Sequence, residues 1–475
     1  MQVPTPSLLA VGRRTPVADC PVAPPTVAAV VPARNEQDSI RASIVSLLDQ
    51  TRPPDSIFVV VNNSTDGTFD VARRFTGRRV FDRPGGRVTC LVTVLDIGTN
   101  DDRRAGALNL AWSLARHHDF VLTVDANSVL ESDGLQALLD EITADGRIGE
   151  VSAVPFLHRG DADTGAVGML VRAQRFEAAA QARRDVARPR SATLQNAQCT
   201  LFRSSALGDV LRRAERLGPW MAGDAAEDPR LRIELADAGY GARVSSGAAS
   251  VGKPLRSLRA VWAQQVKRVA CTERLSGNLD PAAGLALRSE SSAGLVTHLV
   301  SRVLVAVLAV HALVVGVVIG GWLWLLPMLV AVLANVCIAA GMRDRTRADF
   351  AYAALLVPHE LYRSALSVSH AVAVVHERRG CLRDHGADQT AAEEGERVRV
   401  IRFRLVPLLA LGGAAASIPF AWAALPVALR DGSGAAAWLV LALLVGMQSL
   451  GALRTTVGGR APVRAPRLIR DPVPR

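Results

Sequence analysis

At 475 residues and 49% hydrophobic content, the chain is long enough for two or three domains and can bury a sizeable core. Its net charge is +11 and its basic residues are almost all arginine, but most loop arginines flank hydrophobic segments, so we expect membrane lipids as partners and no nucleic acid. The six cysteines lie far apart, which supports neither a disulfide framework nor a zinc site and suits a reducing cytoplasmic domain.

Strands and helices alternate after a Pro-rich leader at 1–25, which we expect to be flexible. The alternation predicts an α/β fold with a parallel, doubly wound sheet. Apolar runs predict the strands, and helical spacing of apolar residues predicts the helices. The expected strands are 26–32, 57–61, 87–95, 120–124 and 149–154, and the expected helices are 39–50, 103–115 and 135–142.

One strand ends on a carboxylate. The apolar run FVLTV at 120–124 stops abruptly at Asp125, which opens the tripeptide DAN. An open α/β sheet places its ligand-binding groups at the carboxyl ends of its strands, so Asp125 is the first candidate for a functional residue. An Asx-type turn is the structural alternative for this tripeptide.

Three further segments carry candidate residues, and each also has a structural explanation. NNSTDGT at 62–68 follows a strand and could simply be a turn in which a side chain caps the next helix. The pair Glu227-Asp228 precedes Pro229, an ordinary way to begin a helix. QQVKR at 264–268 could be no more than a solvated basic helix face.

The C-terminal part is strongly apolar. Residues 303–342 run for about forty positions with only His311 and Asn335 as clearly polar interruptions. One bilayer-spanning helix needs about 20 apolar residues. The run therefore predicts two transmembrane helices over 297–341.

The segment 350–375 is also long enough to cross a bilayer, but its charged side chains would be costly in lipid. We predict an interfacial helix there, with a third span as the alternative. The segment 377–404 is rich in arginine and is predicted to be a cytoplasmic loop. Two more transmembrane helices over 405–453 and a basic cytoplasmic tail at 454–475 complete the expected topology.

Taken in order and with their spacing, these segments resemble the family 2 glycosyltransferases. The resemblance is strongest to membrane-embedded members such as the cellulose, chitin, hyaluronan and poly-N-acetylglucosamine synthases. It covers about residues 26–275. The segments that carry it are PARNE (32–36), NNSTDGT (62–68), RAGALN (104–109), DAN (125–127), LFRSSAL (201–207), AED (226–228) and QQVKR (264–268).

The resemblance implies a cytosolic catalytic domain over 26–290 with a GT-A, Rossmann-like mixed sheet, inverting chemistry and a Mg²⁺ or Mn²⁺ ion. Asp228 is implied as the catalytic base, with Glu227 in support. Asp125 and Asn127 are implied as metal ligands. The implied contacts to the nucleotide sugar come from Glu36, Asn62, Asp66, Arg104, Asp125, Gln265 and Arg268.

The chain departs from the family pattern at several of these positions. Asn127 replaces the second Asp of the D-x-D motif and Asn62 replaces an Asp that often contacts the nucleotide; an amide oxygen is a weaker ligand for a hard dication than a carboxylate. Arg104 stands in place of a usual Lys. Val269 stands where the QxxRW motif has a Trp that stacks on the acceptor sugar, which makes processive synthesis less secure than glycosyl transfer.

The sequence therefore predicts a multi-pass inner-membrane enzyme with a cytoplasmic catalytic domain. It would move a sugar from a nucleotide-sugar donor, for which we expect a UDP-sugar, to a polysaccharide or lipid-linked acceptor, with or without export of the product. Two alternatives stay open. One is a non-processive lipid glycosyltransferase, and the other is a catalytically silent membrane scaffold that binds nucleotide sugar.

Overall fold

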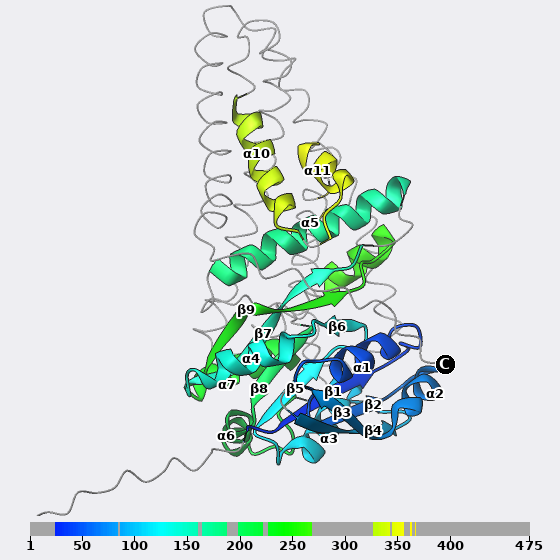
Figure 1. Ribbon diagram of the computed structural model, residues 1–475, viewed down its shortest axis with the longest axis vertical. Coiled ribbons are helices and arrows are strands. Elements are labelled where there is room, and N and C mark those ends of the chain that lie inside the picture. The colour runs from blue at the N-terminus through cyan, green and yellow to red at the C-terminus, as the bar shows by residue number, and fades with distance from the viewer. Residues whose placement is uncertain are drawn as a thin grey trace, which may run out of the picture.

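The structure, a computed structural model, describes residues 24–83, 86–159, 164–187, 198–221, 227–267, 326–342, 344–355, 362 and 366. Within these residues one nine-stranded sheet forms the centre of the molecule, with the strand order β3-β4-β2-β1-β5-β8-β7-β9-β6. Helices cover both faces of this sheet, and α10 and α11 stand at the far side of α5 from it (Figure 1). The predicted α/β class is confirmed.

The first half of the sheet is parallel and close to the sequence prediction. Strand β1 pairs with β2 on one side and with β5 on the other, and β2 pairs with β4, all in parallel. Residues of β1 and β5 are buried on both faces, as expected for a parallel sheet covered by helices. The bounds are β1 Val27–Ala33, β2 Ser56–Val61, β4 Gly86–Asp96 and β5 Phe120–Val124.

The remaining strands make the sheet mixed, which confirms the mixed sheet implied by the resemblance and departs from the parallel sheet that the alternation alone predicted. Strand β3 returns antiparallel to β4, and β8 lies antiparallel between β5 and β7. Strand β9 is parallel to β7 and antiparallel to β6. The bounds are β3 Gly77–Arg83, β6 Ser128–Leu130, β7 Ile148–Leu157, β8 Cys199–Arg203 and β9 Gly241–Gly252.

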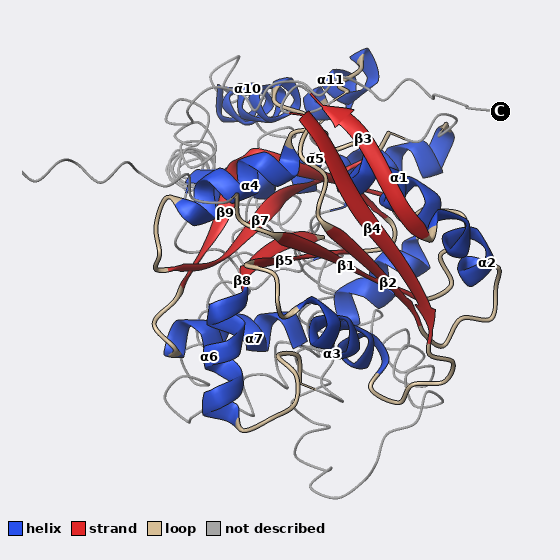
Figure 2. Ribbon diagram, turned by 60° about the horizontal axis from the view of Figure 1, so that its bottom comes forward, coloured by secondary structure: helices blue, strands red, loops and turns tan. Residues whose placement is uncertain are grey.

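Helices on the two faces bury alternate residues of the same strands. In β1, Val27 and Val31 pack on one face with α1 and α4, whereas Ala28 and Val30 pack on the other with α3, α6 and α7. Figure 2 shows the sheet between these two helical layers. The bounds are α1 Ile40–Leu48, α2 Thr68–Ala72, α3 Arg103–Ala115, α4 Gly134–Thr143, α6 Ser204–Ala214 and α7 Glu227–Asp237.

A third apolar cluster joins the sheet domain to the C-terminal helices. Helix α5 (Gly165–Ala187) buries Phe176 and neighbouring alanines against Ile338 of α10 (Leu326–Ala340) and Tyr352 of α11 (Arg347–Ala354). The rings of Phe176 and Tyr352 meet edge to face at a centroid distance of 6.2 Å. The N-terminal domain and these two helices therefore share a packed boundary.

Most of the predicted membrane region lies outside the described residues. This holds for most of the segments at 297–341, 350–375 and 405–453, and for the loop at 377–404, the tail at 454–475 and nearly all of the leader at 1–25. Among the described helices, none combines the length and apolarity that a bilayer crossing requires. Of the predicted interfacial helix at 350–375, the structure describes little more than the first residues, which belong to α11; this helix begins at Arg347 behind a capping box made by Thr346 and Asp349. It ends at Ala354, since Leu355 has an extended conformation.

Candidate active site

Three loops meet at the carboxyl edge of the parallel strands. The loop after β1 and the loop after β2 are adjacent, and the Asn62 amide donates to the Ala33 carbonyl at 3.0 Å. Asp125 follows β5 directly, and its amide donates to the Gln198 carbonyl at 2.9 Å. From β1 the chain adds β2 and β4 on one side and β5 on the other, so the strand order reverses between β1 and β5, which is where open α/β sheets bind ligands.

Arg104 joins the two most important sequence candidates at this edge. It lies in the first turn of α3, and its Nη2 is 3.1 Å from Asp125 Oδ1 while its Nη1 is 2.8 Å from Asp228 Oδ2. The three side chains are 30%, 32% and 29% exposed, respectively. The structure thus brings together residues that lie 21 and 124 positions apart in the chain, around one guanidinium group open to solvent.

The surroundings of Asp125 disfavour its charge. Desolvation raises the pKa of the Asp125 carboxyl, and the attraction and hydrogen bond of Arg104 oppose this rise. The negative charges of Asp228 and Glu36 add to it. A cation near Asp125 relieves the repulsion among these carboxylates, and Arg104 is such a cation.

Asp228 is held by Trp220, whose contact with this carboxylate the sequence did not indicate. The Trp220 indole Nε1 donates to Asp228 Oδ1 at 3.2 Å, and the side chain of Trp220 is only 1% exposed. Asn109, the last residue of the RAGALN segment, holds this tryptophan through both of its backbone groups. A Cβ at Gly218 would lie 2.2 Å from the Asn109 side chain, so glycine is required there. An aromatic residue seven positions before the acidic pair Glu227-Asp228 was the available signal.

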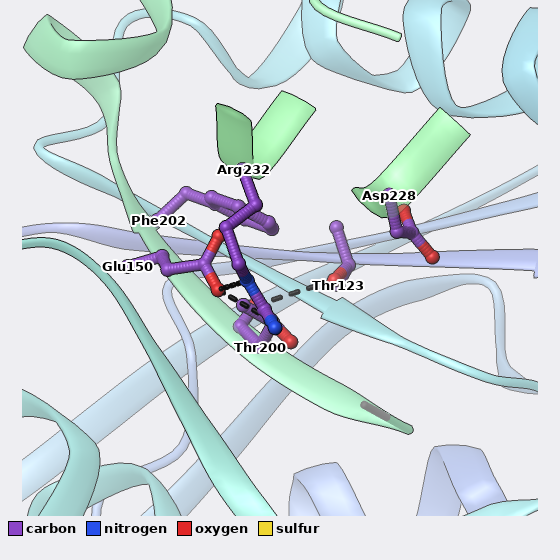
Figure 3. A pocket seen from close by; sticks show the side chains of 6 residues that line it. All are labelled: Thr123, Glu150, Thr200, Phe202, Asp228 and Arg232. Carbon is purple, nitrogen blue, oxygen red and sulfur yellow. Dashed lines mark hydrogen bonds and ion pairs between the residues drawn. The ribbon is translucent and has the colours of Figure 1, made fainter. Parts of the chain in front are cut away.

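A buried ion pair anchors the helix that carries Asp228. Arg232, one turn further along α7, contacts Glu150 of β7 at 2.5 Å, and the Glu150 side chain is almost fully buried. Figure 3 shows this pair beside a small recess, also lined by Thr123, Thr200 and Phe202, with Asp228 at its other end. The recess has a volume of about 10 Å³, room for a single water molecule. The position of Asp228 is therefore set by the sheet.

The loops after β1 and β2 interlock through polar contacts. Asp66 accepts hydrogen bonds from the amide of Gln37 at 3.2 Å and from the amide and hydroxyl of Thr68. Slight desolvation raises the pKa of the Asp66 carboxyl, but these hydrogen bonds outweigh it and the net pKa is lowered. Asn35 and Asn63 adopt left-handed backbone conformations, which asparagine tolerates better than most residues. Asp66 thus supports the loop whether or not it also contacts a nucleotide.

Glu36 and Asn127 are in direct contact. Asn127 Nδ2 donates to Glu36 Oε1 at 3.2 Å, and Ser128 Oγ contacts the Asn127 amide oxygen at 3.2 Å. Asn62 is 2% exposed, and its Nδ2 donates to Asn63 Oδ1. Glu36 therefore belongs to the group around Asp125, whereas Asn62 is buried beneath the loop.

The remaining candidates lie on two helices. Gln265 lies half-buried on the helix at 258–267, whereas the predicted Arg268 lies outside the described residues. Glu227 begins α7, but its side chain is also outside the described part. Trp220 cannot replace the stacking residue that is missing at Val269, because it is buried and a stacking platform must be exposed.

The side chains at this edge offer few charged ligands for a divalent cation. Among the residues that the structure describes, no three acidic, histidine or cysteine side chains are grouped as ligands. Asp125 offers a carboxylate and Asn127 a neutral amide oxygen. Mg²⁺ is commonly bound by one or two carboxylates together with substrate phosphates, so these residues fit a site that the substrate completes.

The fold and the edge described above define the class of the protein, an enzyme with a GT-A, Rossmann-like mixed α/β sheet. Residues 24–276, more than half of the chain, match the family described as glycosyltransferase like family 2, and the chain belongs to that family. The protein is a glycosyltransferase. The roles of its individual site residues stay predictions.

Among solved structures, the chain is similar to PcManGT, a mannosyltransferase from Pyrobaculum calidifontis in complex with GDP-Man and Mn²⁺. The identity is 20% and the TM-score 0.43, over 74% of this chain and 87% of that one. It is also similar to residues 1–349 of S. aureus TarS, at 14% identity and a TM-score of 0.36, over 75% and 92% of the two chains. No curated protein matches the chain. Family membership rests on the match over 24–276.

Proposed function

We propose that the protein is an inverting glycosyltransferase that moves a sugar from a nucleotide-sugar donor to a polysaccharide or lipid-linked acceptor at the cytoplasmic face of the inner membrane. The observation that carries the proposal is the group formed by Arg104, Asp125 and Asp228 at the carboxyl edge of the sheet. The group consists of the Arg104 guanidinium, the Asp125 carboxylate after β5 and the Asp228 carboxylate in the first turn of α7.

The chemistry of transfer needs these types of residue. The acceptor oxygen forms a bond to the anomeric carbon while the bond from that carbon to the diphosphate oxygen breaks, and the electron pair leaves with the diphosphate. Asp228 takes the proton of the acceptor hydroxyl, whose pKa is too high for it to ionise unaided at neutral pH. Arg104 stabilises the negative charge that grows on the diphosphate.

Arg104 is suited to exchange its partners. Its guanidinium is about a third exposed and already contacts two carboxylates, so a diphosphate at this edge can compete for its donors. As Arg104 turns toward the diphosphate, Asp228 keeps its hydrogen bond from Trp220 and gives up its cationic partner. Donor binding would then prepare the base before the acceptor is deprotonated.

Asp125, with the amide oxygen of Asn127, would hold a Mg²⁺ or Mn²⁺ ion together with the donor phosphates. Such an ion supplies further stabilisation of the charge on the departing diphosphate. Gln265, on the helix at 258–267, and Arg268, which follows it in the sequence, would steady the same diphosphate. Asp66, Asn62 and Glu36 would contact or support the nucleoside.

The membrane assignment rests on the apolar runs at 297–341 and 405–453. Helix α10 falls within the first of these runs, and its residues Leu329 and Leu333, one turn apart, are 59% and 63% exposed. Nucleotide sugars are made in the cytosol, and the arginine-rich loops favour the same side for the catalytic domain. A membrane-held acceptor follows from this placement.

A non-processive lipid glycosyltransferase is the second candidate. Val269 lacks an aromatic ring for stacking on a growing chain, and Trp220 is buried under Asp228. With one replacement platform excluded, transfer of a single sugar gains weight relative to polymerisation.

The test is release of nucleoside diphosphate by the purified full chain across UDP- and GDP-sugars, with Mg²⁺, Mn²⁺ or EDTA, followed by sizing of the product. A long product would support the polysaccharide acceptor, and a single sugar on lipid would select the second candidate. Absence of release with every donor would contradict both and favour a silent binder.

A further inference from the structure

Two neighbouring residues of α5 bind two different segments of the chain. Gln174 contacts the segment before the helix at 258–267, and Arg175 contacts the first turn of α11 and the loop between α10 and α11. Both side chains are almost fully buried, Gln174 at 9% and Arg175 at 5% exposure. One turn of α5 therefore lies between a helix of the candidate active site and the C-terminal helices.

The contact made by Gln174 is bidentate. Its Nε2 donates to the Leu255 carbonyl at 2.6 Å, and its Oε1 accepts from the Leu255 amide at 3.1 Å. A side-chain amide that pairs with both backbone groups of one residue fixes the position of that residue and its orientation. Leaving these buried backbone groups unpaired would be costly.

The fixed residue lies shortly before the helix that carries Gln265. Ser257 accepts hydrogen bonds from the amides of Ala260 and Val261, and the helix begins at residue 258, three residues after Leu255. Val261 is buried and Gln265, one turn later, is half-buried, so both lie on the inward face. The Gln174–Leu255 contact therefore sets where Gln265 enters the site.

Arg175 holds the other partner. Its Nη1 lies 3.0 Å and 3.1 Å from the two carboxylate oxygens of Asp349, and its Nη2 donates to the Asp344 carbonyl at 3.3 Å. Asp349 also forms the capping box of α11 with Thr346. The start of α11 is thus fixed to α5 by an ion pair shielded from water.

We propose that Gln174 is a positioning residue for the donor diphosphate, and that Gln174 and Arg175 together couple the α10–α11 loop to the helix that bears Gln265. The inference rests on the proposed function, in which this helix steadies the diphosphate. A change in the packing of α10 and α11 would therefore alter the affinity for the donor diphosphate through α5.

The test compares binding of UDP and UMP, because only UDP has the second phosphate that this helix would hold. In the purified full chain, Gln174→Met keeps the length of the side chain but removes both hydrogen bonds to Leu255, together with the one to the Leu170 carbonyl within α5. We expect it to weaken UDP binding about tenfold, as measured by titration calorimetry, with UMP binding unchanged. Arg172→Met, at a half-buried position on the same helix, is the matched control and should leave both affinities unchanged.

The double variant Arg175→Met/Asp349→Asn tests the coupling. It removes both charges together, so neither is left buried without a partner. We expect UDP binding to weaken about threefold, with UMP binding unchanged. The same titrations with GDP and GMP cover a guanine donor.

The outcomes separate this inference from the proposed function. If the unaltered chain binds neither UDP nor GDP, the proposed function fails and the inference with it. If it binds a diphosphate and Gln174→Met binds it equally well, or loses UDP and UMP to the same extent, the positioning role is wrong. If only the double variant has no effect, the coupling to α10 and α11 is wrong.

Discussion

The protein has two arginine–aspartate ion-pair sites that differ in their exposure to solvent. Arg104 contacts Asp125 and Asp228 with about a third of each side chain exposed, whereas Arg175 and Asp349 form a pair with 4% and 1% exposure. The first group faces an edge that a charged substrate can reach. The second is enclosed between α5, α10 and α11, where nothing can replace either partner. Exposure therefore distinguishes an exchangeable ion pair from a fixed one.

The strongest way to break this comparison is Arg175→Met. It leaves the buried Asp349 without its cation, so we expect a loss of about 3–5 kcal/mol in the free energy of unfolding. Urea unfolding followed by circular dichroism measures this loss.

The control for that prediction is Arg104→Met. Because Asp125 and Asp228 are partly hydrated, we expect a change below about 1 kcal/mol in the free energy of unfolding. Equal losses in the two variants would show that exposure does not distinguish the sites.

Asp228→Asn probes the exchangeable site as a site of chemistry. It keeps the size of the side chain and removes the base, so we expect transfer to slow by about 10² or more with donor binding nearly intact. Single-turnover rates and donor titrations separate the two effects. Equal losses of rate and affinity would instead mark Asp228 as a structural helix start.

Asn127→Asp sharpens the comparison by adding a carboxylate beside Asp125. A further charged oxygen ligand should tighten Mn²⁺ binding about tenfold, measured by titration calorimetry in the presence of UDP. Asn127→Gln, which keeps a neutral amide, serves as its control. Unchanged affinity in Asn127→Asp would place the cation elsewhere.

Asp66→Asn tests a carboxylate that is held by hydrogen bonds and has no ion pair within the described part of the chain, and we expect the smallest effect. Because the folded state lowers the pKa of Asp66, its contribution to stability is present above about pH 4 and is lost as the pH falls through the folded pKa. The difference in urea midpoint between wild type and variant should therefore shrink from pH 7 to pH 3. A difference that grows toward low pH would contradict this sign.

Strands with strong apolar runs could be predicted from the sequence. Strands β1, β2 and β5 and helices α3 and α4 lie within one residue of their expected bounds. Strand β9 was missed because its twelve residues are mostly glycine, alanine and serine, which resemble a loop. Its place in the sheet is set by pairing with β7, and such long-range pairing leaves no local pattern.

The sequence predicted individual residues of the candidate site but not the contacts between them. Asp125 and Asp228 stood out by position and by resemblance, but nothing local indicates that Arg104 contacts both. Trp220 was not recognised as a support for Asp228 because its role depends on the return of the chain through Asn109. Long-range hydrogen bonds of this kind are determined by the fold as a whole.

The bond between Trp220 and Asp228 has a spectroscopic consequence. The fluorescence of an indole whose N–H donates to a carboxylate depends on the charge and the partners of that carboxylate. Trp220 is therefore a natural fluorophore in contact with Asp228, the proposed catalytic base. The emission difference between the wild type and Trp220→Phe isolates its signal from the other six tryptophans. When a diphosphate draws Arg104 away from Asp228, that difference spectrum should shift. Stopped-flow fluorescence could then follow the separation of Arg104 from Asp228 without an added label.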